Sequence, residues 1–385
     1  MTTTRHSSND GRRLQRLHDT GVSIWLDTLS RELLDTGQFA RLISDDAVTG
    51  ATSNPTIFAK AITGSQRYDE QIRAAVGAGI RDPREIFFLL ALDDVRRAAD
   101  LLQPAHASSA GTDGFVSFEC TPDLADDTEG TIEQALELWQ RLDRPNVMIK
   151  VPATAAGIPA IEELTDHGVN VNVTLLFSLE RYEEVIEAYL RGLERRRARH
   201  EPIARINSVA SFFVSRVDAE ADRQLPPDSA LRGRLAIANA ARAHDLWRER
   251  FSGPRWQRLA LSGARPQRPL WASTGTKDPA YRDVRYVEEL VAPGVINTMP
   301  MTTLRAFADH GRAEPTLPAD GAQGVIHDAA AAGVDLRALT TRLERDGVES
   351  FCASYRELLE CIEAKVDHIA EDAHNPSLAP AARAD

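Results

Sequence analysis

Residues 146–177 read NVMIKVPATAAGIPAIEELTDHGVNVNVTLLF, and this stretch of sequence decides the fold. In residues 147–151 and 170–175, every second side chain is β-branched or otherwise apolar, and most of the side chains between them are polar. This period of two is typical of a β-strand. Between them, residues 157–167 carry apolar side chains at helical spacing and are long enough to bring the chain back for a parallel neighbour. The stretch therefore predicts a strand, a helix and a second strand parallel to the first.

Polar side chains fall on one face of each of these two strands. Lys150 shares its face with Met148, and Asn170, Asn172 and Thr174 share a face of the second strand, opposite Val171, Val173 and Leu175. A lysine in a strand more often lies at an edge or extends to water, so this strand alone leaves a structural role open. A buried lysine has a lowered pKa and can form an imine, which is the functional alternative.

Similar short strand patterns alternate with helical patterns along the chain. The eight expected strands are residues 22–27, 47–54, 113–120, 146–152, 170–177, 206–213, 268–274 and 295–300. Alternation of strands and helices indicates a parallel α/β sheet, and eight strands close a barrel. We therefore expect a (β/α)8 TIM barrel with helical insertions at residues 21–311.

The segments outside the barrel are expected to be helical or disordered. Residues 1–20 should form a tail and a short helix, and residues 312–371 a helical extension. Residues 1 to about 10 and residues 372–385 should be disordered. Residues 104–114 resemble a loop in composition. The extension carries an apolar stripe, for which packing on the barrel is favoured over binding a partner. The stripe consists of Phe351, Tyr355, Leu358, Leu359, Ile362 and Val366.

Composition and charge restrict the class of function. The chain has 385 residues, of which 43% are hydrophobic and 26% charged, as in ordinary soluble proteins. A net charge of -12 argues against general binding of nucleic acid or anionic membranes, although a local positive pocket could bind small anions. Three cysteines without metal-ligand spacing indicate free thiols in a reducing compartment. Without a signal sequence or a membrane-spanning run, the expected location is cytoplasmic.

Polar side chains are expected at the C-terminal ends of most strands, and in a TIM barrel these ends meet at one mouth, where active sites lie. Aspartate and asparagine can also end strands as turn formers. Two carboxylates and an amine on three strands are harder to explain in that way, because buried charges are costly unless they pair or have a function. The candidates are Asp27, Asn54, Glu119, Lys150, Asn172, Thr174, Ser211 and the nearby Arg216.

An amine and carboxylates in one dry mouth predict imine chemistry. An amine near other cations in a low-dielectric site has a lowered pKa, so that part of it is neutral and attacks a ketone. The resulting iminium accepts electrons, so a nearby carbon–carbon bond breaks when a base removes the proton of the departing hydroxyl. Carboxylates suit that base and the proton transfers that form and hydrolyse the imine.

The motifs around these residues resemble those of the transaldolase family in its longer bacterial form. The resemblance covers about residues 20–311, and the helical C-terminal part also fits. The combination of SNPT, IKVPAT and NVTLLF in this order and spacing is its most specific feature. The matching motifs are WLDTLSR, GATSNPTIF, FVSFECTP, NVMIKVPAT, GVNVNVTLLFS, SVASFFVSRVD, PLWASTGTKDPAY and VINTMP.

The resemblance implies roles for the catalytic candidates. Lys150 resembles the Schiff-base lysine, and Asp27 the base that takes a proton while the bond between the third and fourth carbons of the donor breaks. Glu119 resembles the acid/base of the imine steps, acting through a water that Thr174 helps to hold. No metal or organic cofactor is implied.

The resemblance also implies a substrate site. Asn54 and Asn172 would bind the hydroxyls of the dihydroxyacetone unit. Ser211 and Arg216 match the phosphate site, and Phe213 the apolar wall beside it. Arginine suits phosphate because its planar guanidinium can bind it with two hydrogen bonds.

Two departures from shorter relatives concern the phosphate site. Those relatives have Ser-Pro-Phe-Val-Gly-Arg where this chain has Phe212 and Ser215 at the changed positions, which affects the turn more than the chemistry. They also place a second phosphate-binding arginine after the seventh strand, where this chain reads STGTKDP. Lys277 is the candidate replacement as a point charge, and the sequence leaves its role open.

Three functions are compared. The leading one is transfer of a dihydroxyacetone unit from sedoheptulose 7-phosphate to glyceraldehyde 3-phosphate, which yields erythrose 4-phosphate and fructose 6-phosphate. The second is an aldolase that releases free dihydroxyacetone, and Glu119 favours transfer over it. The third, a catalytically silent barrel, is disfavoured because buried charges without a function destabilise a protein. Phosphorylated sugars are the expected partners, and the sequence does not distinguish a monomer from a homodimer.

Overall fold

The centre of the molecule is a closed barrel of eight parallel strands, paired in chain order with β8 beside β1. The computed structural model describes residues 10–317 and 320–374. Each strand lies within its predicted range, so the expected TIM barrel is confirmed. The strands are β1 (Ser23–Leu26), β2 (Val48–Thr52), β3 (Phe115–Glu119), β4 (Val147–Pro152), β5 (Val171–Leu176), β6 (Ser208–Phe213), β7 (Arg268–Ala272) and β8 (Ile296–Met299).

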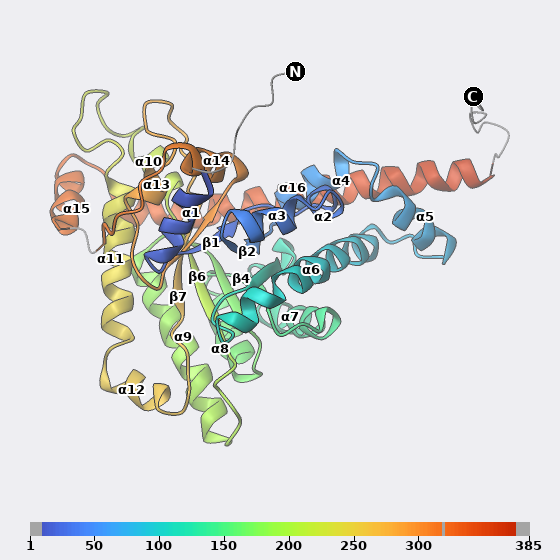
Figure 1. Cartoon of the computed structure of the whole chain (residues 1–385), viewed down its shortest axis with the longest axis horizontal. Coiled ribbons are helices and arrows are strands. Elements are labelled where there is room, and N and C mark those ends of the chain that lie inside the picture. Colours follow the sequence, from blue (N-terminus) through green and yellow to red (C-terminus); the bar gives the residue numbers. More distant parts are fainter. Residues whose placement is uncertain (1–9, 318–319, 375–385) are drawn as a thin grey trace.

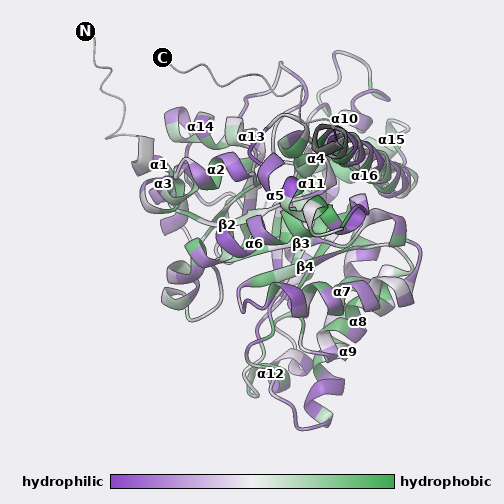
Figure 2. Cartoon of the chain, turned by 90° about the vertical axis from the view of Figure 1, so that its right-hand side faces the viewer, coloured by the Kyte–Doolittle hydropathy of each residue, from purple (hydrophilic) through white to green (hydrophobic). Residues whose placement is uncertain are grey.

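Helices surround the barrel (Figure 1), and hydrophobic residues gather in the strands and on the helix faces turned toward them (Figure 2). The helices that connect β1 to β6 are α2 (Arg31–Asp35), α3 (Gln38–Asp45), α4 (Pro55–Thr63), α5 (Asp69–Gly77), α6 (Pro83–Ser108), η1 (Pro122–Leu124), α7 (Thr128–Leu142), α8 (Gly157–Asp166) and α9 (Leu179–Ala198). The others are α1 (Asp10–Asp19), α10 (Ser215–Ala221), α11 (Leu235–Arg250), α12 (Pro254–Ala260), α13 (Arg285–Glu288), α14 (Met301–His310), α15 (Ala322–Ala331) and α16 (Leu336–His374).

The end of the barrel at the N-termini of the strands is filled by a hydrogen-bonded group around Trp25. Its indole Nε1 donates to Asp113, and the hydroxyl of Ser23 donates to the same carboxylate. Arg268 donates in turn to that hydroxyl at 2.7 Å. A Cβ at Gly50 would lie 2.4 Å from the indole, so only glycine lets β2 pass this ring. The filled floor restricts a substrate to the other end of the barrel.

One expectation about the helices was wrong. The predicted loop at residues 104–114 begins only after Ser108, because α6 continues through Pro104. Its last turn is held by tertiary contacts: His106 Nδ1 lies 2.8 Å from the carbonyl oxygen of Asp113, and its ring packs edge-on against Phe115. Of the ends expected to be disordered, residues 1–9 and 375–385 lie outside the described residues, and residues 372–374 continue α16.

Strand β5 also departs from the expected alternation. Its pairing with β6 shifts between Val173 and Leu176, and Leu175 has a φ of 56°, which is uncommon for a residue other than glycine. As a result, the side chain of Leu175 does not point to the same face of the sheet as that of Val171. Its side chain lies against Gly347 of α16 instead.

Helix α16 lies across one end of the barrel and extends beyond it (Figure 1). It contacts α4, α5, α6 and α10. Of the predicted apolar stripe, Leu359 is partly buried, and the other members are buried in the main core. Lys365 binds Asp69 of α5 at 2.6 Å. This single helix therefore packs against helices that follow several different strands, at the end of the barrel where β5 ends.

Candidate active site

The C-terminal ends of the strands surround a cavity of about 330 Å³. Most of the predicted site residues line it, and they come from six of the eight strands or the loops that follow them. Glu119 and Asn172 lie behind this lining and contact members of it. The predicted residues in the lining are Asp27, Asn54, Lys150, Thr174, Ser211, Phe213, Arg216 and Lys277.

Lys150 lies on β4 with only 5% of its surface exposed, so it does not extend to solvent. Its Nζ donates to the carbonyl oxygen of Ser53 at 3.0 Å and to Glu119 Oε2 at 3.3 Å. Strand register explains this arrangement, because Glu119, Lys150 and Asn172 are paired across β3, β4 and β5. A buried amine with a single carboxylate partner is placed to act as a nucleophile.

Two carboxyl groups flank the amine. Asp27 follows β1, and its Oδ1 accepts a hydrogen bond from Thr52 at 2.8 Å. Burial raises the pKa of Asp27 above its usual value, against the opposing charge of Lys150. Burial also raises the pKa of Glu119, again opposed by Lys150. Carboxyl groups with raised pKa values are suited to exchange protons with a substrate near neutral pH.

Thr174 presents an unused hydroxyl to the cavity. Its side chain is fully buried, and its Oγ1 has no hydrogen-bond partner within the described protein. Buried hydroxyl groups are normally hydrogen-bonded, so this oxygen marks a position for a water molecule or a substrate hydroxyl.

The two asparagines differ in how many of their side-chain hydrogen-bonding groups are free to bind a substrate. Asn54 caps α4, where its Oδ1 accepts from the backbone N–H of Ile57 at 3.0 Å, which leaves its amide N–H groups to donate. Asn172 is fully buried, donates to Ser117 at 2.9 Å and accepts from Ser211 at 2.7 Å. Both ends of Asn172 are therefore occupied, and the Ser211 hydroxyl proton is directed toward it rather than into the cavity.

The cationic end of the cavity is formed by Arg216 and Lys277. The guanidinium carbon of Arg216 lies 5.3 Å from the centre of the Phe213 ring. Burial lowers the pKa of Arg216, opposed by the charge of Asp27. Within residues 10–317 and 320–374, Arg216 forms no ion pair with a carboxylate, so its hydrogen-bond donors are available to an anion. Lys277 is exposed, and its positive charge also lowers the pKa of Asp27, against the effect of burial.

Several residues of the lining were missed by sequence reasoning. Thr52 and Thr298 lie on β2 and β8, where their places in the strands would have revealed them. Nothing in the local sequence distinguishes Phe351, because it reaches the cavity only through the docking of α16. The missed residues include Thr52, Thr56, Lys60, Ser273, Thr298 and Phe351.

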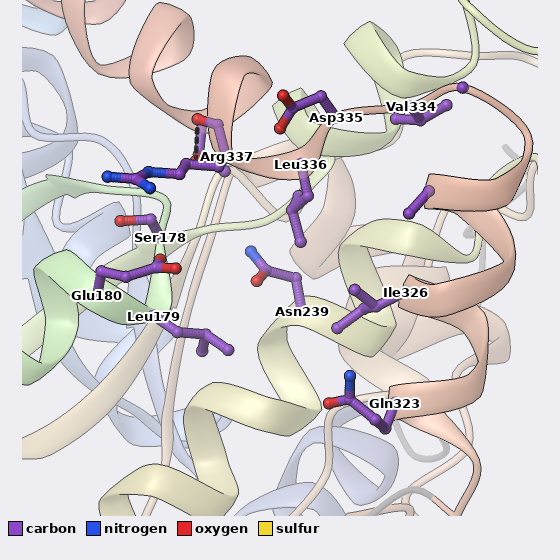
Figure 3. A pocket seen from close by; sticks show the side chains of 13 residues that line it. Ser178, Leu179, Glu180, Asn239, Gln323, Ile326, Val334, Asp335, Leu336 and Arg337 are labelled. Carbon is purple, nitrogen blue, oxygen red and sulfur yellow. Dashed lines mark hydrogen bonds between the residues drawn. The ribbon is translucent and has the colours of Figure 1, made fainter.

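A second cavity of about 470 Å³ lies between α9, α11, α15 and α16 (Figure 3). Two helices begin at it, but both are already capped. Ser178 accepts from the N–H of Arg181, and Asp335 accepts from the N–H of Ala338. This cavity lacks a buried amine with a carboxylate partner, so the candidate chemistry lies at the barrel mouth.

In the described part of the chain, no three His, Cys, Asp or Glu side chains gather as they would around a metal ion. Among the helices that the structure describes, none has both the length and the apolar character to cross a membrane.

Comparison with known proteins identifies the family. Residues 24–362 match the family described as transaldolase/fructose-6-phosphate aldolase. A transaldolase of Saccharopolyspora erythraea is 51% identical over 363 residues, which are 92% of this chain and 98% of that protein. Transaldolase 1 of Streptomyces avermitilis is 48% identical over 92% of this chain and 96% of its own length, and a transaldolase of Mycobacterium bovis is 47% identical over 93% and 98%. These matches confirm the resemblance of the motifs, and the chain belongs to the transaldolase/fructose-6-phosphate aldolase family.

Proposed function

We propose that this protein is a transaldolase, a transferase of the non-oxidative pentose phosphate pathway. It transfers a dihydroxyacetone unit from sedoheptulose 7-phosphate to glyceraldehyde 3-phosphate and yields erythrose 4-phosphate and fructose 6-phosphate. The observation that carries the proposal is the buried Nζ of Lys150, 3.3 Å from Glu119, in a cavity that also contains Asp27 and Arg216. The names of the relatives support the same reaction.

In the proposed mechanism, Lys150 attacks the ketone carbon of the donor, and loss of water gives an iminium. Glu119 supplies and removes the protons of these steps, with a water held at Thr174. Asp27 then takes the proton of the C4 hydroxyl, the C3–C4 bond breaks, and its electrons form an enamine on Lys150. The enamine attacks the acceptor aldehyde, and hydrolysis of the new iminium releases the product and the free amine.

The same cavity accommodates the rest of the substrate in this proposal. The amide N–H groups of Asn54 bind a hydroxyl of the three-carbon unit, and Arg216 binds the phosphate with Lys277 as a second charge. Phe213 forms the apolar wall under Arg216. Ser211 donates a hydrogen bond to Asn172 at 2.7 Å, and this bond stabilises the wall of the cavity. We assign contact with the substrate to both residues as well.

Trapping of the imine tests the proposal directly. Borohydride reduction in the presence of fructose 6-phosphate should leave a three-carbon adduct on Lys150, located by mass spectrometry of its peptide. The Lys150→Met variant serves as the matched control and should give no adduct. An adduct on another residue, or none in the unmodified protein, contradicts the mechanism.

The alternative is an aldolase that releases free dihydroxyacetone, since the description of the family covers both activities. The two reactions share Lys150 and differ in the fate of the enamine. Consumption of fructose 6-phosphate measured with and without an aldehyde acceptor separates them. Equal rates in both assays would favour the aldolase.

Three finer points belong to the proposal. The protein is cytoplasmic, it is a monomer or a homodimer, and residues 21–311 form the catalytic barrel with residues 312–371 as its extension. Phosphorylated sugars are its partners, and neither nucleic acid nor a membrane has a part. Cell fractionation tests the location, and light scattering at several concentrations tests the assembly.

A further inference from the structure

Helix α16 supplies one wall of the active-site cavity, although it lies outside the barrel. Phe351 of this helix lines the cavity together with Lys150 and is 4% exposed. The mechanism proposed above gives no task to any residue of α16. Phe213 is the other aromatic side chain in the described lining, and it already has a part in that mechanism, so the presence of Phe351 needs an explanation of its own.

The position of Phe351 follows from the path of α16 over the barrel mouth. Gly347, Phe351 and Ser354 are four and three residues apart, so they share one face of the helix. At one side of the mouth, a Cβ on Gly347 would lie 3.8 Å from Arg216 Nη1. At the other side, Ser354 accepts a hydrogen bond from Thr56 of α4 at 2.7 Å. Phe351 stands between these two contacts and faces the cavity.

The docking of α16 fixes this wall in place. Tyr355, Leu358 and Ile362 are buried in the turns that follow Phe351. The Tyr355 ring lies 5.8 Å from the ring of Phe87 on α6, in an edge-on arrangement. These contacts hold the helix independently of Phe351.

The proposed chemistry presents a problem that such a wall would solve. The enamine on Lys150 has a nucleophilic carbon with two possible fates. It can form a carbon–carbon bond with the acceptor aldehyde, whose oxygen then takes a proton. It can instead take a proton on the same carbon, which gives the iminium of dihydroxyacetone. Water hydrolyses that iminium to dihydroxyacetone and the free amine, so transfer requires that water be kept from the intermediate.

We propose that Phe351 is a specificity-determining residue that favours transfer over release. Its ring occupies the side of the cavity under α16, where water would otherwise reach the enamine while the first aldose leaves and the second enters. This inference rests on the proposed transaldolase function. The residue that decides between transfer and release then lies about two hundred positions after Lys150 in the sequence.

The partition ratio of the full-length protein tests this inference. With fructose 6-phosphate as donor and erythrose 4-phosphate as acceptor, the rate of dihydroxyacetone release is divided by the rate of sedoheptulose 7-phosphate formation. In Phe351→Ala this ratio should rise about tenfold, as expected when bulk water gains freer access to the intermediate. Phe351→Leu keeps most of the apolar volume and should give an intermediate ratio. It carries the same test if the alanine variant fails to fold.

Leu358→Ala is the matched control, because Leu358 is fully buried in the same helix and does not line the cavity. It should lower stability and leave the partition ratio unchanged. An unchanged ratio in both Phe351 variants, or an equal rise in Leu358→Ala, overturns the inference. Failure of the proposed function itself would look different, since the unmodified protein would then show no transfer or no adduct on Lys150.

Discussion

Glu119 and Lys150 form an ion pair in the barrel mouth, with 3.3 Å between Oε2 and Nζ and only 6% of each side chain exposed. The two residues are direct partners in the register of β3 and β4, so the sheet itself sets their distance. Removing two charges from water costs several kcal/mol per ion, and their attraction recovers this only with good geometry. Among the residues that the structure describes, the carbonyl of Ser53 is the only other hydrogen-bond partner of the amine, so the pair suits reactivity better than stability.

Glu119→Gln tests this assignment, because glutamine keeps the shape and a hydrogen-bond acceptor while it removes the charge. We expect kcat to fall about 10²- to 10⁴-fold, which is the usual contribution of a general acid–base group. Borohydride trapping on Lys150 should become slower in the same variant. The melting temperature should change little, since the amine keeps an acceptor. A variant with normal kcat would exclude Glu119 from the proton transfers.

Sequence reasoning succeeded where a local pattern determines the direction of a side chain. Alternation in β4 places Lys150 on the inner face of the barrel, and pairing with β3 then brings it to Glu119. It failed where distant contacts decide. The bulge at Leu175 depends on how β5 meets β6 and α16, and α6 continues through Pro104 because its last turn packs on β3.

The candidate site shows the same division. Strand ends revealed the amine, both carboxylates and Asn54, because parallel strands of a barrel all point to one mouth. The hydrogen bond between Asn172 and Ser211 was not predictable, since it depends on the side-chain rotamers of two residues on neighbouring strands. Phe351 was read correctly as part of an apolar stripe, but its place at the cavity follows from the crossing of a distant helix.

The pH dependence of kcat/KM should report the buried state of Asp27. Burial raises its pKa, while the charge of Lys150 and the hydrogen bond from Thr52 lower it. A base must be ionised to act, so the acid limb should lie at higher pH than an exposed aspartate would give. Thr52→Val removes the hydrogen bond and should move the limb to still higher pH. Thr298→Val, which leaves the bond to Asp27 intact, should move it less, and equal limbs in all three proteins would contradict the assignment.

Arg216 and Lys277 should differ in their effect on phosphate binding. Arg216 is half-buried and can bind phosphate with two hydrogen bonds, whereas Lys277 is an exposed point charge. We expect Arg216→Lys to lower kcat/KM for fructose 6-phosphate about 100-fold and Lys277→Ala about 5-fold, in line with the strength of charge-assisted and exposed contacts. Only the effect of Lys277→Ala should largely disappear in high salt. Comparison with unphosphorylated fructose as donor provides the control, since neither substitution should change that activity much.

Asp218, behind the mouth, should make folding stability depend on pH. It accepts from the N–H of Ala236 at 2.7 Å and from the Tyr286 hydroxyl at 2.8 Å, and burial raises its pKa to about 6. A raised pKa means that the stabilising protonated form is complete below the unfolded value of about 4 and is lost as the pH rises through about 6. Two pKa units correspond to roughly 3 kcal/mol.

Asp218→Asn measures this contribution, because asparagine has a similar shape and does not titrate. The difference in unfolding free energy between the unmodified protein and the variant should fall by roughly 3 kcal/mol between about pH 4 and pH 7. Other buried carboxyl groups titrate in both proteins and cancel in the difference. Urea unfolding at a series of pH values gives the measurement. A difference that stays constant across this range would mean that Asp218 titrates as an exposed aspartate, and a difference that grows would reverse the sign of its pKa shift.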